Sequence, residues 1–197
     1  MQKIAIVVPL YYCNTDLYLK ITSCYISIAG LEDHRLIVID DASPLNIPSD
    51  WYITGKNRKN LGFTKTVNKG LKRAFERDTG IVIVMNDDIV ITPECFERFK
   101  GLTGLQIASP RDTASSDDDR FGACWGMTRE VYKLLGGLDE KYKHFYSDLD
   151  YYLRAKDAGV EIIKWDDITL PHSESSTFKH LDKNTLLNQD RERFENV

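Results

Sequence analysis

Short apolar runs alternate with amphipathic stretches along most of the chain, a pattern typical of a parallel sheet covered by helices. The apolar runs predict strands at residues 3–8, 36–39, 81–85, 105–109, 122–127 and 160–165, with a short one at 51–54. Helical spacing predicts amphipathic helices whose inward residues are Leu17, Ile21, Cys24, Tyr25 and Ile28, then Val67, Leu71, Ala74 and Phe75, then Val131, Leu134 and Leu135. This alternation predicts an α/β fold, a three-layer α/β/α sandwich with a mostly parallel central sheet.

Capping residues and breakers mark the remaining elements. Thr92 and Pro93 form an N-cap and first-turn pair for a short helix, and Thr128 caps the helix that carries Val131. A helix over residues 148–158 ends at Gly159, and residues 183–194 predict a weak, charged helix. Residues 110–120 are polar and include three successive aspartates at 117–119, which favours a solvated surface loop.

Length and charge narrow the class of protein. A chain of 197 residues suits one well-buried core, so we expect a single domain over residues 1–197. The net charge of −4 argues against a broad, non-specific grip on nucleic acid and leaves room for a local basic patch. No stretch approaches the roughly 20 apolar residues that span a bilayer, and the run at 4–8 is too short for a signal peptide.

The cysteines show no spacing of a metal site or a redox motif. Four are present, Cys13, Cys24, Cys95 and Cys124. This arrangement favours reduced, mostly structural thiols in a cytoplasmic protein.

Polar clusters stand where several predicted strands end. They lie at residues 40–41, at 86–88 and, at a helix start, at 147–150, and His172 follows a further apolar run. The carboxyl ends of strands in an open α/β sheet are where ligands bind, and oxygen ligands there suit a hard cation shared with substrate phosphates. The alternative for residues 86–88, Asn-Asp-Asp, is ordinary turn chemistry after a strand.

Several common nucleotide and hydrolase motifs are missing from the chain. No G-x-G-x-x-G follows the first strand, which disfavours a dehydrogenase-type dinucleotide fold. No G-x-x-x-x-G-K-[ST] and no G-x-S-x-G occurs, which removes the ordinary P-loop hydrolases and the nucleophile-elbow enzymes. A nucleotide bound through carboxylates and a metal on its diphosphate remains compatible with the pattern.

An ordered series of motifs resembles a known family. The first half carries VVPLY at 7–11, VIDDAS at 38–43, NLGF at 60–63, NKG at 68–70 and MNDD at 85–88; the second carries GACWGMTR at 122–129, LGGLDE at 135–140 and a segment from 148 to 159. In this order they resemble the family 2 glycosyltransferases, which have the GT-A fold, and are nearest the rhamnosyltransferase-like branch. The resemblance covers about residues 3–177, with a nucleotide-sugar-binding half at about 1–100, an acceptor and catalytic half at about 101–177 and a helical tail at 178–197.

The resemblance implies a nucleoside diphosphate sugar as donor and a Mg²⁺ or Mn²⁺ ion. Asp88 matches the metal-binding acid and His172 a histidine that often completes the metal site, with a structural histidine as the alternative. Asn86 stands where many relatives have an aspartate. Asp40 or Asp41 would contact the base or ribose; the alternative is a strand-ending turn. The full implied donor-binding set is Pro9, Tyr11, Asp40, Asp41, Asn60, Gly62, Asn68, Asn86 and Asp87.

Asp148 matches the catalytic base of inverting members, which takes the proton from the acceptor hydroxyl as that oxygen attacks the anomeric carbon. Ser147 stands where the family usually has a glutamate. Residues 147–150 also form a capping-box-like pattern, in which Ser147 caps the helix and Asp150 reaches back to it. Trp125, Gly126 and Asp150 would belong to the sugar and acceptor region, although a tryptophan on a strand is as readily a core residue.

Three functions follow in order of preference. The first is an inverting, metal-dependent glycosyltransferase, with a glycan, a lipid-linked glycan, a protein or a modified nucleic acid as acceptor. The second is a non-catalytic sugar-nucleotide-binding module, and the third is a nucleotidyltransferase. We expect a cytoplasmic protein, free or peripheral at a membrane, whose acceptor site is either shallow or completed by a homodimer or another partner.

Overall fold

A mixed sheet of seven strands forms the centre of the molecule. The computed structural model describes residues 3–114, 121–172 and 183–195. The strands are β1 (Ile4–Leu10), β2 (His34–Asp40), β3 (Gly55–Lys56), β4 (Ile81–Met85), β5 (Gln106–Asp112), β6 (Cys124–Thr128) and β7 (Glu161–Leu170), in the spatial order β3-β2-β1-β4-β6-β5-β7. Only β6 runs antiparallel to its neighbours among the described strand pairs. The predicted mostly parallel sheet is confirmed.

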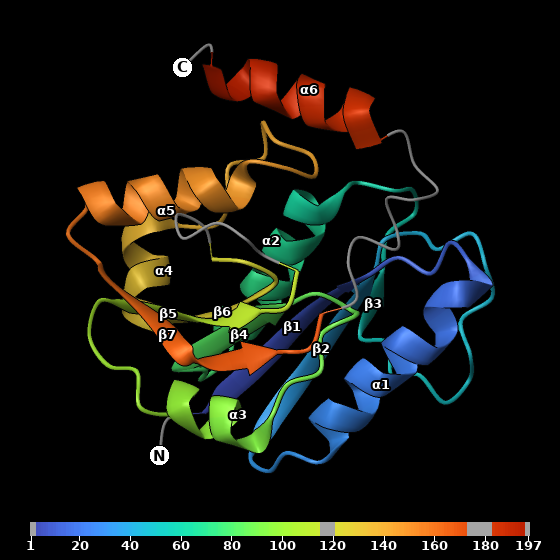
Figure 1. Ribbon diagram of the computed structural model, residues 1–197, viewed down its shortest axis with the longest axis horizontal. Helices are drawn as coiled ribbons and strands as arrows, with labels where there is room; N and C mark the ends of the chain where they lie inside the picture. Colours follow the sequence, from blue (N-terminus) through green and yellow to red (C-terminus); the bar gives the residue numbers. More distant parts are fainter. Residues whose placement is uncertain (1–2, 115–120, 173–182, 196–197) are drawn as a thin grey trace.

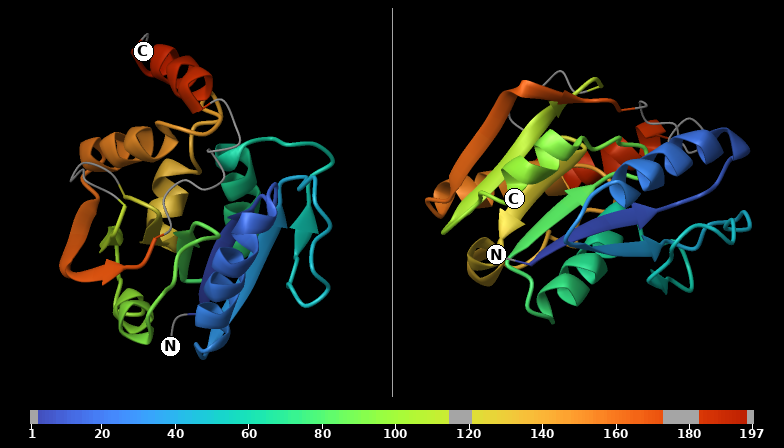
Figure 2. Two further views of the ribbon diagram at one scale, coloured as in Figure 1. Left: turned by 45° about the vertical axis from the view of Figure 1, so that its right-hand side comes forward. Right: turned by 90° about the horizontal axis from the view of Figure 1, so that it is seen from below.

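Helices cover both faces of this sheet (Figure 1). They are the 3₁₀ turn η1 (Thr15–Leu17) and the helices α1 (Tyr18–Ala29), α2 (Phe63–Phe75), α3 (Pro93–Phe99), α4 (Arg129–Leu135), α5 (Ser147–Asp157) and α6 (Lys183–Glu195). One core cluster joins the sheet to α1 and α3, and a second joins its other face to α2, α4 and α5. The two further views in Figure 2 show the same three layers, which confirms the sandwich.

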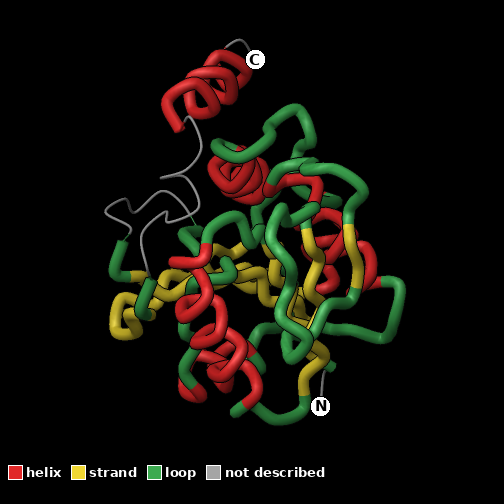
Figure 3. Tube along the Cα trace, turned by 90° about the vertical axis from the view of Figure 1, so that its right-hand side faces the viewer, coloured by secondary structure: helices red, strands yellow, loops and turns green. Residues whose placement is uncertain are grey.

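The β1 strand shows why the sequence folds this way. Its residues are buried almost without exception, and they alternate between the two cores, with Ile6 in the first and Val7 in the second. A strand that is buried on both faces reads as a continuous apolar run, because each face is covered by helices. The α6 helix is the exception among the layers, since it lies outside them, beyond α5 (Figures 1 and 3).

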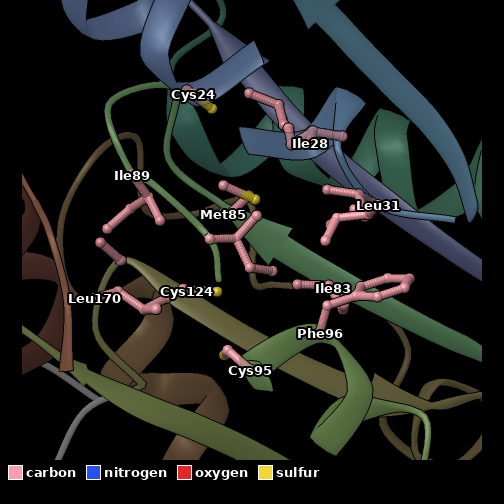
Figure 4. Packing of buried hydrophobic residues seen from close by; sticks show 14 of the residues in the cluster. Cys24, Ile28, Leu31, Ile83, Met85, Ile89, Cys95, Phe96, Cys124 and Leu170 are labelled. Carbon is pink, nitrogen blue, oxygen red and sulfur yellow. The ribbon is translucent and has the colours of Figure 1, made fainter. Parts of the chain in front are cut away.

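The first core contains the buried thiols. Cys24, Cys95 and Cys124 gather around Met85 between α1, α3 and the sheet (Figure 4). All the cysteines are free thiols, and burial raises the pKa of the Cys95 thiol to about 12. These groups therefore act as small apolar side chains in packing.

Several expected boundaries differ from the structure. The third strand is β3 at Gly55–Lys56 rather than residues 51–54, and β5 continues through Asp112, so residues 110–112 are strand and not loop. Thr92 and Thr128 cap α3 and α4 as expected. Leu134 was expected to point inward and is 50% exposed. The aspartates at 117–119 lie outside the described residues.

None of the helices in the described ranges is long and apolar enough to cross a membrane.

Candidate functional site

The carboxyl ends of β1, β2 and β4 bring Tyr11, Asp41 and Asp87, three of the expected donor-binding residues, to one edge of the sheet. Register places Leu10 beside Asp40, and the backbone N–H of Asp41 donates to the carbonyl of Leu10 (2.8 Å). The backbone N–H of Tyr11 donates to Oδ2 of Asp87 (3.2 Å), 76 residues along the chain. Burial, together with the neighbouring charge of Asp88, raises the pKa of Asp87. A carboxylate pair held here favours a cation close by.

Asp88 and His172 meet at this edge, as the resemblance implied. An isolated β-bridge between Ile89 and His172 places Nε2 of His172 3.3 Å from Oδ1 of Asp88, and these two side chains are 12% and 10% exposed. On the other side of the ring, Nδ1 lies 2.9 Å from Oδ1 of Asp112. Burial lowers the pKa of His172, but the hydrogen bonds to Asp112 and Asp88 outweigh it and raise the pKa to about 9.

Asp112 is a residue that the sequence analysis missed. It is 6% exposed, and its carboxylate also accepts from the backbone N–H groups of Ala114 and Ala123. A carboxylate on one ring nitrogen fixes the tautomer and orientation of a metal-binding histidine. Asp112 therefore leaves Nε2 of His172 as the nitrogen that faces Asp88.

The pair Asp88 and His172 fits a divalent cation with few protein ligands. No group of three or more His, Cys, Asp or Glu side chains able to hold a metal occurs within the part of the chain that the structure describes. A carboxylate oxygen and an imidazole nitrogen leave most coordination positions to water and to phosphate oxygens, which is the arrangement that phosphate-bound cations adopt in proteins.

The two acids at the end of β2 organise the neighbouring loop. Asp41 is 4% exposed; its Oδ1 accepts from the backbone N–H of Leu61 (2.8 Å), and its Oδ2 accepts from that of Gly62 (2.8 Å). Oδ1 of Asp40 accepts from the backbone N–H of Ser43 (2.8 Å), and Lys56 Nζ lies 3.0 Å from Oδ2 of Asp40. The strand-ending turn anticipated as an alternative is therefore present, and it shapes the edge where a ligand would bind.

Asn60 and Asn68 hold backbone in place. Asn60 Nδ2 donates to the carbonyl of Asp41 (3.5 Å). The Asn68 amide pairs with Leu138 twice, donating to its carbonyl and accepting from its N–H, both at 2.8 Å. Asn68 thus ties α2 to the segment that leads into α5.

Asp148 stands in the first turn of α5 and is partly exposed. The loop before α5 packs on the segment that contains Gly62, just before α2. A Cβ added at Gly62 would lie 2.5 Å from Lys143 Cγ, and the backbone N–H of Thr64 donates to the carbonyl of Lys143 (3.2 Å). Because Gly62 is itself bonded to Asp41, this chain of contacts links the end of β2 to the start of α5. The amino end of a helix also favours a carboxylate in its first turn.

The expected capping box at 147–150 is wrong. The N-cap is Tyr146, with φ of 63°, so α5 begins at Ser147 itself. Ser147 is 1% exposed, and its hydroxyl has no hydrogen-bond partner among the residues that the structure describes. Asp150 does not reach back; its Oδ2 accepts from Arg154 Nε (2.8 Å) one turn further on. The left-handed residue at 146 ends the loop and removes the geometry that a capping box requires.

Trp125 and Gly126 lie in the core rather than on an open surface. Trp125 is 2% exposed and packs on Phe121 and Tyr151, with ring centroids 5.2 and 5.6 Å apart. A Cβ at Gly126 would lie 2.6 Å from Phe99 Cδ1. This packing favours the core role that the sequence analysis left open for Trp125.

Asp190 on α6 is a second residue that the sequence analysis missed. It is 1% exposed, and its carboxylate accepts from the backbone N–H groups of Lys143, His144 and Phe145 at 2.8–3.1 Å. Burial raises the pKa of Asp190, but these three N–H groups outweigh it and lower the pKa below its usual value. The α6 helix, drawn above this loop in Figure 1, therefore anchors the backbone of residues 143–145, which leads into α5 and Asp148.

Comparison with known proteins places the fold. No family model and no curated protein matches the chain. Among solved structures it is similar to a mannosyltransferase from Pyrobaculum calidifontis in complex with GDP-Man and Mn²⁺ (TM-score 0.71, 14% identity, 99% of this chain and 64% of that one). It is also similar to the catalytic domain of Drosophila β1,4-galactosyltransferase 7 in complex with xylobiose (TM-score 0.68, 13% identity, 91% and 74%) and to S. aureus TarS 1–349 (TM-score 0.65, 14% identity, 88% and 60%).

These likenesses establish the fold. The chain spans less than two thirds of the length of the mannosyltransferase and of TarS 1–349. The architecture is of the GT-A type, as the resemblance implied, and the similar structures include a mannosyltransferase in complex with GDP-Man and a galactosyltransferase.

Proposed function

We propose that the protein transfers a sugar from a nucleoside diphosphate sugar to an acceptor hydroxyl with the help of a divalent cation. The observation that carries this proposal is the meeting of Asp88 and His172 at the ligand-binding edge of a GT-A sheet. The motifs assign the chain to family 2, nearest the rhamnosyltransferase-like branch, and this assignment is part of the proposal.

Oδ1 of Asp88 and Nε2 of His172 would hold the cation. When bound, a divalent ion there stabilises the negative charge that builds on the leaving diphosphate. Imidazole nitrogen is a poor ligand for Mg²⁺, which prefers an all-oxygen octahedron, whereas Mn²⁺ accepts a mixed set. We therefore expect Mn²⁺ to bind more tightly than Mg²⁺ to this pair.

Asp148 acts as the general base in this proposal. Its place in the first turn of α5, beyond the loop that packs on Gly62, suits a group facing a donor held at the strand ends. It accepts the proton of the acceptor hydroxyl as the oxygen attacks the anomeric carbon from the side opposite the diphosphate, which inverts the configuration.

Replacement of the base tests this assignment. Asp148→Asn should abolish transfer while the binding of the nucleotide diphosphate with Mn²⁺ changes little, because the substitution keeps the shape and removes the proton acceptor. Asp157→Asn, at the exposed far end of the same helix, is the matched control and should retain full activity. Full activity of Asp148→Asn would remove this residue from the mechanism.

A non-catalytic sugar-nucleotide-binding module is the second candidate. It is favoured by Asn86 in the metal motif and by Ser147 at the position where the family usually carries a glutamate. A thermal-shift screen of UDP, GDP and dTDP, each with and without Mn²⁺, identifies the base through the rise in apparent stability. Slow hydrolysis of the matching donor sugar then supports the transferase, and binding without turnover supports the module.

A further inference from the structure

A cavity of about 330 Å³ lies at the start of β2, away from the strand ends that carry Asp40 and Asp88. Its lining comes from the start of β2, the segment before β3 and the end of α2, and comprises Arg35, Leu36, Ile37, Tyr52, Thr54, Arg73, Glu76 and Arg77. At about 3.3 Å per strand residue, Arg35 stands roughly 16 Å along β2 from Asp40. A similar separation, about 15 Å along α2, divides Arg73 from the Gly62 loop.

The charges in this arginine cavity are unbalanced. Three guanidinium groups and one carboxylate line it, a local charge of 3 − 1 = +2 in a chain of net charge −4. Among the described residues, no carboxylate forms an ion pair with Arg35, Arg73 or Arg77. Cationic side chains gathered in a hollow without counter-charges raise the local concentration of anions.

Two of the guanidinium groups are held by backbone. Arg35 Nη2 donates to the carbonyl of Arg73 (2.6 Å), and Arg73 Nη1 donates to the carbonyl of Thr54 (2.5 Å). Each guanidinium has five N–H donors, so these single bonds fix the groups and leave donors for a ligand. Arg35 and Arg77 both line the cavity, and burial, followed by the charge of Arg77, lowers the pKa of Arg35.

We propose that the arginine cavity binds a small ligand through a phosphate group, at a site separate from the donor edge. A planar guanidinium group can donate two parallel N–H bonds to the oxygens of one phosphate. The cavity volume of about 330 Å³ lies at the lower end of the range for small-molecule sites. Tyr52, 56% exposed at the rim, offers a ring and a hydroxyl to the organic part of a phosphomonoester. This site does not depend on the proposed sugar transfer.

Titration calorimetry with inorganic phosphate and with glycerol 3-phosphate tests the proposal, in EDTA so that no cation fills the Asp88–His172 pair. Arg77→Gln is the informative variant, because no described residue bonds to the Arg77 side chain and the fold does not depend on it. Loss of one bidentate contact should weaken binding about ten- to a hundredfold. Lys72→Gln removes the same charge from an exposed position of α2 outside the cavity and should change affinity less than twofold.

Further arms separate the alternatives. Asp88→Ala should bind phosphate as the unaltered protein does; loss of binding there would put the anion at the donor edge and overturn the proposal. Equal weakening by Arg77→Gln and Lys72→Gln, or no binding at millimolar ligand, would also overturn it. Sedimentation with phosphatidic acid vesicles, with phosphatidylcholine vesicles as the control, identifies the source of the phosphate. Pelleting that depends on Arg77 assigns the phosphate to a lipid headgroup. Binding of phosphate without pelleting assigns it to a soluble ligand.

Discussion

Removing the carboxylate of Asp190 is the sharpest test of how the loop before α5 is held. In the folded chain this single side chain accepts from three successive backbone N–H groups, 143–145, and pairs with Arg193 at 2.6 Å. Asp190→Ala leaves these donors without an acceptor in a position that is 1% exposed. The substitution therefore loosens both the docking of α6 and the backbone that enters α5.

The structure sets the size of this effect. A hydrogen bond to a charged group contributes about 1.5–3 kcal/mol, and three shared by one carboxylate, partly replaced by entering water, give a loss of about 3–5 kcal/mol. For a chain of this length, each kcal/mol shifts Tm by about 2–4 °C, so we expect a fall of about 6–20 °C. Asp78→Ala is the control, because Asp78 forms an exposed ion pair with Lys3 (3.3 Å) worth no more than about 1 kcal/mol.

Urea unfolding followed by circular dichroism measures the free energy of unfolding of both variants. Asp190→Asn should fall between Asp190→Ala and the unaltered protein, because its amide oxygen still accepts one or two of the N–H groups without the charge. If Asp190→Ala is no less stable than Asp78→Ala, the carboxylate does not anchor the loop, and the reasoning from its burial and bonding fails.

Three further substitutions test the site and its supports. Asp112→Asn should lower Mn²⁺ affinity about ten- to a hundredfold in titration calorimetry, because the charge that orients the His172 ring is lost; unchanged affinity would contradict this. Gly62→Ala should lower the free energy of unfolding by about 1–3 kcal/mol, since φ is 88° and the new Cβ would meet Lys143 2.5 Å away; unfolding at the same urea concentration as the unaltered protein would refute it. Burial, followed by the charge of Lys143, lowers the pKa of His144 from 6.5 to about 4, so the unfolded chain takes up a proton between these values and the folded chain does not. As the pH falls through that window, the protein should lose up to about 3 kcal/mol relative to His144→Gln, and parallel stability curves would exclude this role.

The interior strands were predictable because burial on both faces leaves a continuous apolar run, as in β1 and β4. The edges were not. The β3 strand is two residues long and pairs with Ile39 and Asp40 of β2, so it is too short to carry a pattern of its own. The polar end of β5 is a strand because Arg111 and Asp112 pair with the end of β7, nearly 60 residues away. Long-range pairing of this kind leaves no local signal.

The candidate site likewise contains residues that the sequence indicated and residues that it did not. Asp88 and His172 were singled out because each follows an apolar run and matches a family motif; the β-bridge at Ile89 brings them together, and their role as cation ligands stays a prediction. Asp112 was missed because it lies in a stretch that looked like a solvated loop. The capping box failed because the left-handed backbone at Tyr146 shifts the helix start, and that conformation depends on the packing of the loop.

The residues that position the proposed chemistry are polar side chains bonded to backbone far along the chain. Asp41 holds Gly62, Asn68 holds Leu138, and Asp190 holds the loop over residues 143–145. In the sequence such residues look like ordinary surface positions, because the sequence does not distinguish a polar side chain that faces water from one that bonds a distant peptide group. What separates the two cases is burial, since a buried polar group must find partners. The geometry around Asp148 therefore depends on contacts that only the folded chain creates, whereas the meeting of Asp88 and His172 depends on strand ends that the apolar pattern already marks.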